Sequence, residues 1–226
     1  MSDILITGSG SGLGAAMVDA LRLDGHTVHE FDHANGHDVR YPMETFGPPP
    51  EQLDVLINCA GINHIDWLQN FEDERWDEVM DTNAKGIFKM SQWALPSLTY
   101  TRGTILNIVS NASHMPMTCS LAYNASKGAA HIMTLQLARE LTRTRGITVF
   151  GISPNKLAGT GMSEDIDRQV VTTRGWTAEE AHKYQLAGLL TGQETPPEAV
   201  ADFVAYLLAH KANHRFLTGC VLPYGA

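Results

Sequence analysis

The chain has 226 residues, of which 43% are hydrophobic and 18% charged, with a formal net charge of -9 and a pI of about 5.5. This size and composition are typical of a globular domain with a substantial core and exclude a disordered or fibrous chain. The acidic balance and the lack of large Lys/Arg clusters argue against nucleic acid as a partner.

The cysteines and histidines give no sign of a metal site. Cys59, Cys119 and Cys220 lie far apart in the sequence, which predicts reduced thiols. No two histidines form a helical His-x-x-x-His pair beside a carboxylate, so we expect no metal. The chain enters an apolar run without a charged leader, and no stretch of about 18 apolar residues occurs. We therefore expect a soluble, cytoplasmic protein with no membrane contact.

Short apolar runs alternate with segments of helical periodicity along the chain. The predicted strands cover 4–6, 27–31, 55–57, 105–109 and 148–152, and predicted helices cover 15–23, 83–95 and 123–141. Parallel βαβ units produce this alternation. Strands that are apolar on both faces fit a sheet covered by helices on both sides. The sequence therefore predicts a Rossmann-like, doubly wound α/β fold in one domain over residues 1–226.

The segment 157–197 interrupts this rhythm. It is mostly polar, and Thr177 with Glu180 three residues later forms a capping-box pattern at the start of a helix. Long irregular segments often close over a site, so we expect 157–197 to be a substrate lid. Candidate pocket residues, each also compatible with core or surface, are His114, Met115, Met117, Met162, Trp176 and Tyr184.

A glycine-rich turn follows the first predicted strand, with glycines at 8, 10, 12 and 14 before an apolar helix. Glycines let backbone amides approach a pyrophosphate, and the helix N-terminus adds the positive end of its dipole. Glycine also serves in purely structural turns. The position between a strand and a helix nevertheless favours a nucleotide cofactor.

Asp32 ends the second predicted strand, twenty residues after Gly12. At this position an acidic side chain can accept hydrogen bonds from the adenosine ribose hydroxyls and repel a 2′-phosphate. We therefore expect NAD to be preferred over NADP. The alternatives are a solvated aspartate at a strand end and a phosphate contact from Arg40.

Tyr123, Lys127 and Ser110 have side chains suited to proton transfer. Tyr123 and Lys127 are four residues apart and share one helix face. The ordinary pKa of tyrosine, about 10, must fall for it to act as a base, and Lys127 is placed to stabilise the phenolate. Ser110, after strand 105–109, could hydrogen-bond the substrate oxygen. A Tyr-x-x-x-Lys pair alone is common by chance.

Taken in order, these motifs resemble those of the short-chain dehydrogenase/reductase family over nearly the whole chain. They are Thr7-Gly8-x-x-x-Gly12-x-Gly14, Asp38-Val39, Asn58-Cys59-Ala60-Gly61, Asn83, Ser110, Tyr123-Asn124-Ala125-Ser126-Lys127 and Thr218-Gly219. They resemble the nucleotide loop, the adenine-contacting pair, the Asn-Asn-Ala-Gly signature, the catalytic asparagine and serine, the Tyr-x-Ala-Ser-Lys motif and a C-terminal Thr-Gly. The agreement of several motifs in one order leaves little room for coincidence.

The resemblance implies an enzyme that interconverts an alcohol and a ketone or aldehyde with NAD(P). Tyr123 would exchange a proton with the substrate oxygen while a hydride passes between its carbon and nicotinamide C4. Lys127 would also hold the nicotinamide ribose, and Asn83 would position a water that links Lys127 to solvent. The implied cofactor contacts are Gly8, Ser11, Gly12, Leu13, Gly14, Asp32, Asp38, Val39, Asn58, Ala60, Gly61, Tyr123, Lys127, Pro154, Leu157 and Thr160.

The family resemblance further implies a homo-oligomer, either a tetramer or a dimer, with the predicted helices 83–95 and 123–141 in an interface.

Two segments depart from the family pattern. Only five residues separate Asp32 from Asp38, too few for a helical crossover. We therefore expect a truncated third strand and a more open adenine pocket. Asn155 stands where the family has glycine after Pro154; because asparagine tolerates left-handed backbone, we expect the turn to survive.

Three other functions were weighed against this prediction. A non-catalytic, NAD-binding regulatory protein with the same fold would lack a catalytic residue, whereas all four are present. A sugar-nucleotide epimerase or dehydratase needs a sizeable C-terminal substrate domain, for which the chain beyond Lys127 is too short. Nothing specific in the sequence indicates a structural or assembly protein.

Overall fold

Six parallel strands form one sheet in the computed structural model, which describes residues 1–225. Their order is β2-β1-β3-β4-β5-β6. The strands are β1 (Asp3–Thr7), β2 (Thr27–Phe31), β3 (Val55–Asn58), β4 (Thr104–Ile108), β5 (Thr148–Pro154) and β6 (Val221–Tyr224). The five predicted strands are thus confirmed within two residues at each end, and β6 is an additional edge strand.

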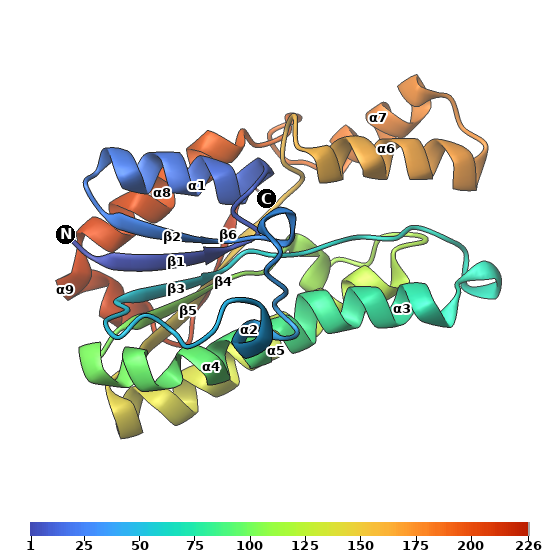
Figure 1. The fold of residues 1–226 in the computed structure, drawn as a ribbon. Coiled ribbons are helices and arrows are strands. Elements are labelled where there is room, and N and C mark those ends of the chain that lie inside the picture. Colours follow the sequence, from blue (N-terminus) through green and yellow to red (C-terminus); the bar gives the residue numbers. More distant parts are fainter. Residues whose placement is uncertain (226) are drawn as a thin grey trace.

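Helices cover both faces of the sheet (Figure 1). On one face lie α1 (Gly12–Leu23) and α8 (Pro197–Ala209), and on the other lie α4 (Gly86–Thr101) and α5 (Leu121–Arg145). Ile4 and Ile6 of β1 pack in the cluster under α1 and α8, whereas Leu5 packs in the opposite cluster. Because each face meets its own helix layer, the strand is apolar at three successive positions, Ile4 to Ile6. The doubly wound α/β fold is confirmed.

The remaining elements are short or lie at the carboxyl edge of the sheet. They are α2 (Pro42–Thr45), α3 (Asp73–Met80), a π-helical turn η3 (Asp81–Lys85), α6 (Gly161–Arg174), α7 (Ala178–Ala187), α9 (Lys211–His214) and the 3-10 turns η1 (His33–Asn35), η2 (Leu68–Asn70), η4 (Asn111–Ser113) and η5 (Arg215–Leu217). Within the described residues, none of these helices is both long and apolar enough to cross a membrane.

The expected truncation lies at the β2 edge of the sheet. After β2, Asp32 caps η1 and Gly36 turns the chain with φ +82°, so that it returns toward β3. β2 is the edge strand of the sheet in residues 1–225, and no third strand lies beyond it. The physical reason is the shortness of the connection, since a parallel crossover needs a dozen or more residues.

The segment 157–197 forms α6 and α7, which project beyond the carboxyl edge of the sheet (Figure 1). The predicted capping box is present: the Thr177 side chain accepts from the Glu180 amide, and the Glu180 carboxylate accepts from the Thr177 amide. A small apolar cluster of Ile65, Val170 and Ala181 joins this segment to the loop after β3. The segment is therefore docked on the rest of the chain rather than detached from it.

The turn at Asn155 forms without left-handed backbone at that residue. Within the described residues, the non-glycine residues with positive φ are Arg102 and Cys119. Asn155 instead acts through its side chain, which is 8% exposed. Its Oδ1 accepts a hydrogen bond of 2.6 Å from the Thr195 hydroxyl, and its Nδ2 donates to the Gly225 carbonyl. Asparagine at this position therefore ties the loop after β5 to the start of α8 and to the C-terminal segment.

Candidate active site

The glycine-rich turn lies where β1 ends and α1 begins, and two of its glycines are required sterically. A Cβ at Gly8 would lie 2.8 Å from Ala60 Cα, and one at Gly14 would lie 1.9 Å from the Gly8 carbonyl oxygen. The helix begins at Gly12, and the Ser11 side chain makes no capping hydrogen bond. The first amides of this helix, including that of Leu13, therefore suit an anionic ligand such as a pyrophosphate.

The loop after β5 faces this turn. A Cβ at Gly12 would lie 3.4 Å from Thr160 Cγ2, and both residues line a cavity of about 430 Å³. Thr160 caps α6 by accepting from the Ser163 amide at 3.2 Å. Pro154 ends β5, and Leu157 pairs with Thr195 in an isolated parallel bridge. One predicted cofactor residue of each loop, Gly12 and Thr160, thus lines the same cavity.

Asp32 lies beside the glycine turn. Its Oδ2 accepts from the Gly10 amide at 2.9 Å, and its Oδ1 accepts from the Ala34 amide at 2.8 Å. A Cβ at Gly10 would lie 2.9 Å from the Asp32 carboxyl carbon, so the turn approaches the carboxylate closely. This arrangement places a negative charge next to the phosphate-binding turn, at the end of β2, where ribose hydroxyls are bound in dinucleotide sites.

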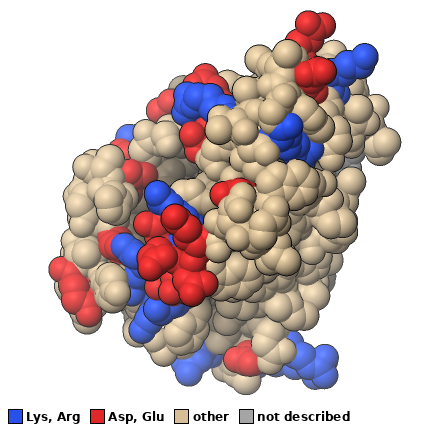
Figure 2. All heavy atoms as spheres, turned by 90° about the vertical axis from the view of Figure 1, so that its right-hand side faces the viewer, with Lys and Arg blue, Asp and Glu red and all other residues tan. Residues whose placement is uncertain are grey.

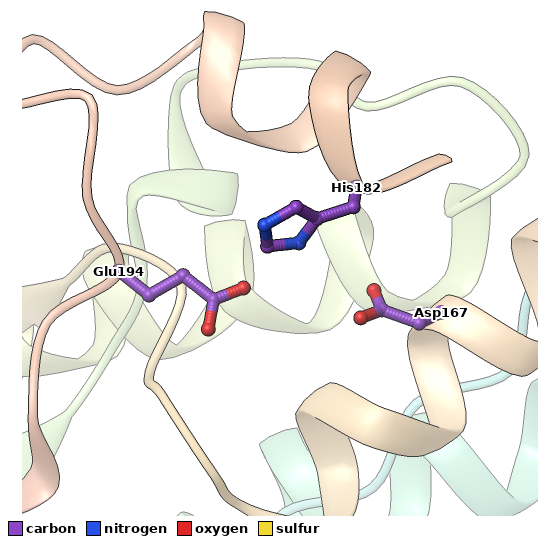
Figure 3. Close-up of side chains that lie close together, drawn as sticks. All are labelled: Asp167, His182 and Glu194. Atoms are coloured by element: carbon purple, nitrogen blue, oxygen red, sulfur yellow. The ribbon is translucent and has the colours of Figure 1, made fainter. Parts of the chain in front are cut away.

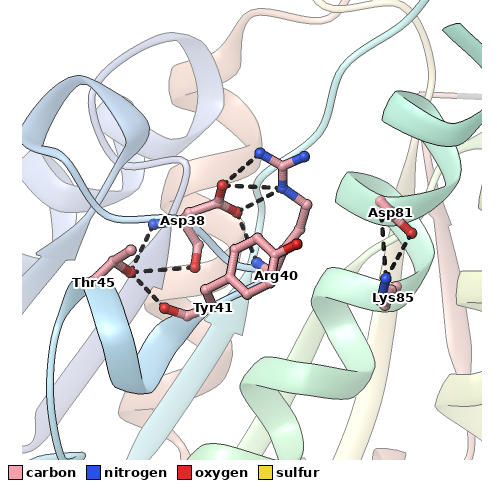
Figure 4. Close-up of polar contacts among 6 residues, drawn as sticks. All are labelled: Asp38, Arg40, Tyr41, Thr45, Asp81 and Lys85. Atoms are coloured by element: carbon pink, nitrogen blue, oxygen red, sulfur yellow. Dashed lines mark hydrogen bonds and ion pairs between the residues drawn. The ribbon is translucent and has the colours of Figure 1, made fainter. Parts of the chain in front are cut away.

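Asp38 and Arg40 form a two-pronged ion pair in the connection between β2 and β3 (Figure 4). Arg40 Nη2 lies 2.6 Å from Asp38 Oδ2, and Arg40 Nε lies 2.9 Å from Oδ1. This pairing holds the pKa of Asp38 below its usual value. Val39 is buried against Gly86 of α4. Because Arg40 is committed to Asp38, it would have to leave this pair to bind a 2′-phosphate.

Two buried polar atoms near the glycine turn have no hydrogen-bond partner among residues 1–225. They are Ser9 Oγ in the turn and Asn58 Oδ1 at the end of β3. The Asn58 amide nitrogen is satisfied, since it donates to Asn107 Oδ1 at 2.8 Å. Buried polar atoms without partners are uncommon in native proteins and often face a ligand. With the uncapped helix and the sterically required glycines, they fit a dinucleotide that crosses this edge of the sheet.

Tyr123 and Lys127 lie on one face of α5, as predicted, and are only 9% and 5% exposed. Lys127 Nζ is 5.7 Å from the centre of the Tyr123 ring and donates to the Ile108 carbonyl at 3.0 Å. Ser110 caps η4, where its Oγ accepts from the Ala112 amide at 3.1 Å. The structure therefore brings these three predicted residues together at the ends of β4 and α5.

Burial governs the protonation of Tyr123 and Lys127. Burial raises the pKa of Tyr123, and the hydrogen bond from Ser110 acts in the opposite direction. Burial lowers the pKa of Lys127 to about 8. Ser110, rather than Lys127, is thus the neighbour that lowers the pKa of the phenol in this structure. Desolvation, which the sequence does not reveal, therefore acts on both side chains.

The lowered pKa of Lys127 predicts a specific pH dependence of stability. Between pH 8 and the usual lysine value of about 10.4, the unfolded chain binds a proton that the folded protein lacks. Stability therefore rises with pH across this window. We expect the unfolding free energy of the parent to rise by on the order of 2 kcal/mol between pH 8 and pH 10 relative to Lys127→Met. Urea unfolding at both pH values measures this, and parallel pH profiles would contradict it.

Asn83 lies in the π-helical turn η3 and is completely buried. Its Oδ1 accepts from the Ile62 amide at 2.8 Å, and its Nδ2 donates to the Ile62 carbonyl at 2.9 Å and to Ser126 Oγ at 3.0 Å. π-helical turns often occur at functional sites. The side-chain amide is thus committed to holding the loop after β3 against α5, beside Lys127.

A charged cluster joins the loop after β5 to the segment 157–197. Asp167, His182 and Glu194 have potential ligand atoms within 4.8 Å of one another and point toward a common centre (Figure 3). However, the Lys156 ammonium group already pairs with both carboxylates, at 2.5 Å from Asp167 and 3.1 Å from Glu194. Gln185 of α7 also donates to Asp167. A lysine cation therefore balances the charge that a metal ion would otherwise have to balance.

The candidate pocket residues are placed unequally. His114, Met115 and Met117 lie in an exposed loop, and Tyr184 is half exposed. Trp176 and Tyr184 both contact Arg174, whose guanidinium lies 4.7 Å from each ring centre.

On the face beside the carboxyl ends of the strands, charged side chains of both signs gather left of centre, with a broad uncharged surface to the right (Figure 2). The sequence reasoning singled out neither Lys156, which pairs with Asp167 and Glu194, nor the buried Asn63.

Comparison with known proteins identifies related chains. Residues 27–170 match the family described as short chain dehydrogenase. Sorbitol-6-phosphate 2-dehydrogenase of Klebsiella pneumoniae is 28% identical over 96% of this chain and 91% of its own. Levodione reductase superposes with a TM-score of 0.83 at 22% identity, covering 99% of this chain and 96% of its own. The 3-ketoacyl-(acyl-carrier-protein) reductase from Brucella melitensis, complexed with NADH, has a TM-score of 0.79 at 23% identity, covering 98% and 96%.

Proposed function

The chain belongs to the short-chain dehydrogenase/reductase family, and from this premise we propose that Tyr123, Lys127, Ser110 and Asn83 form its catalytic group. Members of this family are NAD(P)-dependent oxidoreductases that act on CH-OH or carbonyl groups. This protein is therefore an oxidoreductase of the same kind. The observation that carries the proposal is the placement of the buried Tyr123 and Lys127 on one face of α5, with Lys127 Nζ 5.7 Å from the centre of the Tyr123 ring and bonded to the Ile108 carbonyl two residues before Ser110.

In the proposed reaction, Ser110 and Tyr123 hold the substrate oxygen. A bound nicotinamide cofactor would accept the hydride, with its two electrons, in oxidation and would donate it in reduction. In oxidation the Tyr123 phenolate takes the hydroxyl proton, and in reduction the phenol returns a proton to the carbonyl oxygen. Lys127, with a pKa of about 8, can accept or release a proton near neutral pH. The substrate oxygen therefore stays hydrogen-bonded throughout the proton transfer.

The proposed cofactor site runs along the carboxyl edge of the sheet. The turn of Gly8, Ser11, Gly12, Leu13 and Gly14 would hold the pyrophosphate. Asp32 would bind the adenosine ribose, and Asp38 with Val39 would contact the adenine. The remaining contacts, on the nicotinamide side, would come from Asn58, Ala60, Gly61, Tyr123, Lys127, Pro154, Leu157 and Thr160.

We propose that this site prefers NAD over NADP, because Asp32 would repel a 2′-phosphate. Replacing Asp32 with asparagine keeps an oxygen for the Gly10 amide and removes the charge. We expect the ratio of kcat/KM with NADP to kcat/KM with NAD to rise about tenfold. Asp32→Ala should shift the ratio in the same direction. Initial rates with both cofactors measure it, and unchanged ratios in both variants would refute the assignment.

The experiment that tests the proposed reaction is a screen of secondary alcohols and ketones with NAD(H) and NADP(H), followed by absorbance of the reduced cofactor. We expect cofactor-dependent turnover of at least one alcohol/ketone pair. A protein that binds NADH tightly but turns over none of the panel would instead be the non-catalytic, NAD-binding regulator considered above.

Two structural features support further proposals about this enzyme. We propose that 157–197 acts as a substrate lid, because α6 and α7 project beyond the carboxyl edge of the sheet, next to the proposed site, and meet the loop after β3 through a small apolar cluster. We also propose a homo-oligomer assembled through α4 and α5, where Phe88 and Ile132 are 48% and 61% exposed. Large exposed apolar side chains on neighbouring helices are typical of subunit interfaces. Light scattering in solution tests the assembly.

A further inference from the structure

The turn formed by Thr118 and Cys119, just before α5, has strained backbone. Cys119 has φ +69°, in the left-handed region that residues other than glycine rarely adopt. Among residues 1–225, the other non-glycine residue with positive φ is Arg102, which follows α4, and helices commonly end in one left-handed residue. Cys119 precedes a helix, so this reason does not apply to it. Strained backbone persists only where the surrounding structure holds it, and it clusters at functional sites.

Two segments outside its own loop hold this turn. Arg174, the last residue of α6, donates from Nη2 to the Thr118 carbonyl at 2.8 Å. The Asp66 amide, in the loop after β3, donates to the Cys119 carbonyl at 3.0 Å. Cys119 also packs against the small apolar cluster that joins 157–197 to this loop. The proposed lid therefore grips the strained turn directly.

The Arg174 side chain is itself held in place by two aromatic rings of the proposed lid. Its guanidinium carbon lies 4.7 Å from the ring centres of Trp176 and Tyr184, and the two rings lie edge to face with their centres 5.1 Å apart. A guanidinium group stacks favourably on aromatic faces. Because stacking fixes the plane of the group, its donor already points in a defined direction when it meets the Thr118 carbonyl.

The strained turn leads directly into the helical turn that carries Tyr123. Tyr123 is the third residue of α5, and the Ser120 side chain before this helix makes no capping hydrogen bond. The Asn124 amide donates to the Ser120 carbonyl at 2.9 Å, which closes the first turn. Helix ends fray readily, and a side-chain cap is the usual protection. The first turn of α5 therefore depends on Cys119, the residue that precedes Ser120.

We infer that Arg174 is a positioning residue for Tyr123. While the proposed lid is docked, Arg174 holds the turn of Thr118 and Cys119 in its strained form, and this turn fixes the start of α5. When the lid leaves, Cys119 relaxes and the first turn of α5 loosens. Proton transfer is thereby coupled to lid docking. The inference rests on the proposed roles of Tyr123 and of 157–197, and Arg174 takes no part in the proton transfer itself.

Hydrogen exchange tests this coupling without any substrate. Arg174→Gln has a shorter, uncharged side chain and loses the bond to Thr118. We expect the amides of 118–124 to exchange about tenfold faster than in the parent, together with those of α6 and α7. Arg168→Gln is the matched control, since Arg168 lies on the same helix with a side chain that is 70% exposed and pairs with Asp165. It should exchange at parental rates. Parental exchange of 118–124 in Arg174→Gln would overturn the inference.

A second substitution tests whether the coupling runs through the strained turn. Glycine adopts left-handed backbone without steric cost, so Cys119→Gly should hold the turn without help from Arg174. In the double variant Arg174→Gln/Cys119→Gly, we expect exchange of 118–124 to return to within about threefold of the parent, while α6 and α7 stay fast. A merely structural role of Arg174 predicts no such recovery. Fast exchange of 118–124 in the double variant would contradict the inference.

A kinetic measurement separates the inference from the proposed function. With a secondary alcohol that the parent oxidises, we expect Arg174→Gln to lower kcat about tenfold and Cys119→Gly to restore most of it in the double variant. The affinity for NADH should stay within about twofold, because the effect falls on Tyr123 and not on the glycine turn. Parental kcat in Arg174→Gln would count against the inference. Turnover of no alcohol by the parent would count against the proposed function, and the exchange measurements would still decide the coupling.

Discussion

Replacing Tyr123 with phenylalanine should lower kcat about 1,000-fold. The variant keeps the ring and its packing near Lys127 and removes only the phenol that carries the proton and bonds to Ser110. Because the hydroxyl is not needed to bind the dinucleotide phosphates, NADH affinity should change little. The loss should therefore appear in kcat rather than in cofactor binding, and stopped-flow turnover with NADH titration measures both quantities.

A matched control makes this result specific to the site. Tyr100 of α4 is 74% exposed, and Tyr100→Phe removes the same hydroxyl from a position outside the proposed site. It should retain parental kcat. Near-parental turnover in Tyr123→Phe would refute the proposed role of the phenol, and an equal loss in both variants would show that the loss is not specific to Tyr123.

Replacing Gly14 with alanine should strongly lower both the free energy of unfolding and the affinity for NADH. The new Cβ would lie 1.9 Å from the Gly8 carbonyl oxygen and 2.7 Å from its carbon, both rigid backbone atoms. The turn must move away from α1 to relieve this overlap, and α1 supplies the proposed phosphate-binding amides. We expect destabilisation of about 2–4 kcal/mol and at least a tenfold loss of NADH affinity. Urea unfolding and NADH titration measure the two effects.

Gly161→Ala is the control for this substitution. Gly161 also opens a helix, α6, and a Cβ there would meet no heavy atom within 4 Å. Alanine is intrinsically better than glycine in a helix, so this variant should be as stable as the parent or slightly more stable. Parental stability and NADH affinity in Gly14→Ala would show that the glycine turn is not the steric cradle described here.

The sheet could be predicted because its strands are buried on both faces. Runs such as 4–6 and 148–152 are buried at every position and mostly apolar, as expected for a sheet between two helix layers. α3 gave no such signal, since only Val79 of its eight residues is buried. The edge strand β6 has no fully buried residue and contains Pro223, so its pattern does not stand out from a loop.

The proposed site was only partly accessible from the sequence. The spacing of Tyr123 and Lys127 placed them on one helix face, and the family motifs added Ser110 and Asn83. The desolvation of these side chains depends on packing from several elements, so the pKa directions were not accessible. The unpaired amide of Asn63 and the cation of Lys156 between two carboxylates likewise depend on contacts between distant segments.

Asn155 illustrates a different limit of motif reasoning. The sequence pattern places it at a glycine position, and the expectation considered its backbone alone. In the structure its side chain makes the decisive contacts, with Thr195 and the Gly225 carbonyl, residues far away in sequence. A departure from a family motif can thus be compensated by new side-chain bonds that a local pattern does not reveal.

The central claim is that this chain transfers a hydride between an alcohol carbon and nicotinamide, with the proton passing through Tyr123. The most direct measurement is oxidation of a secondary alcohol that carries deuterium on its carbinol carbon, with NAD as the acceptor. We predict that the parent forms reduced cofactor with the deuterium at C4 of the nicotinamide and that Tyr123→Phe forms almost none. Reduced cofactor without deuterium, or equal formation by both proteins, would contradict the account.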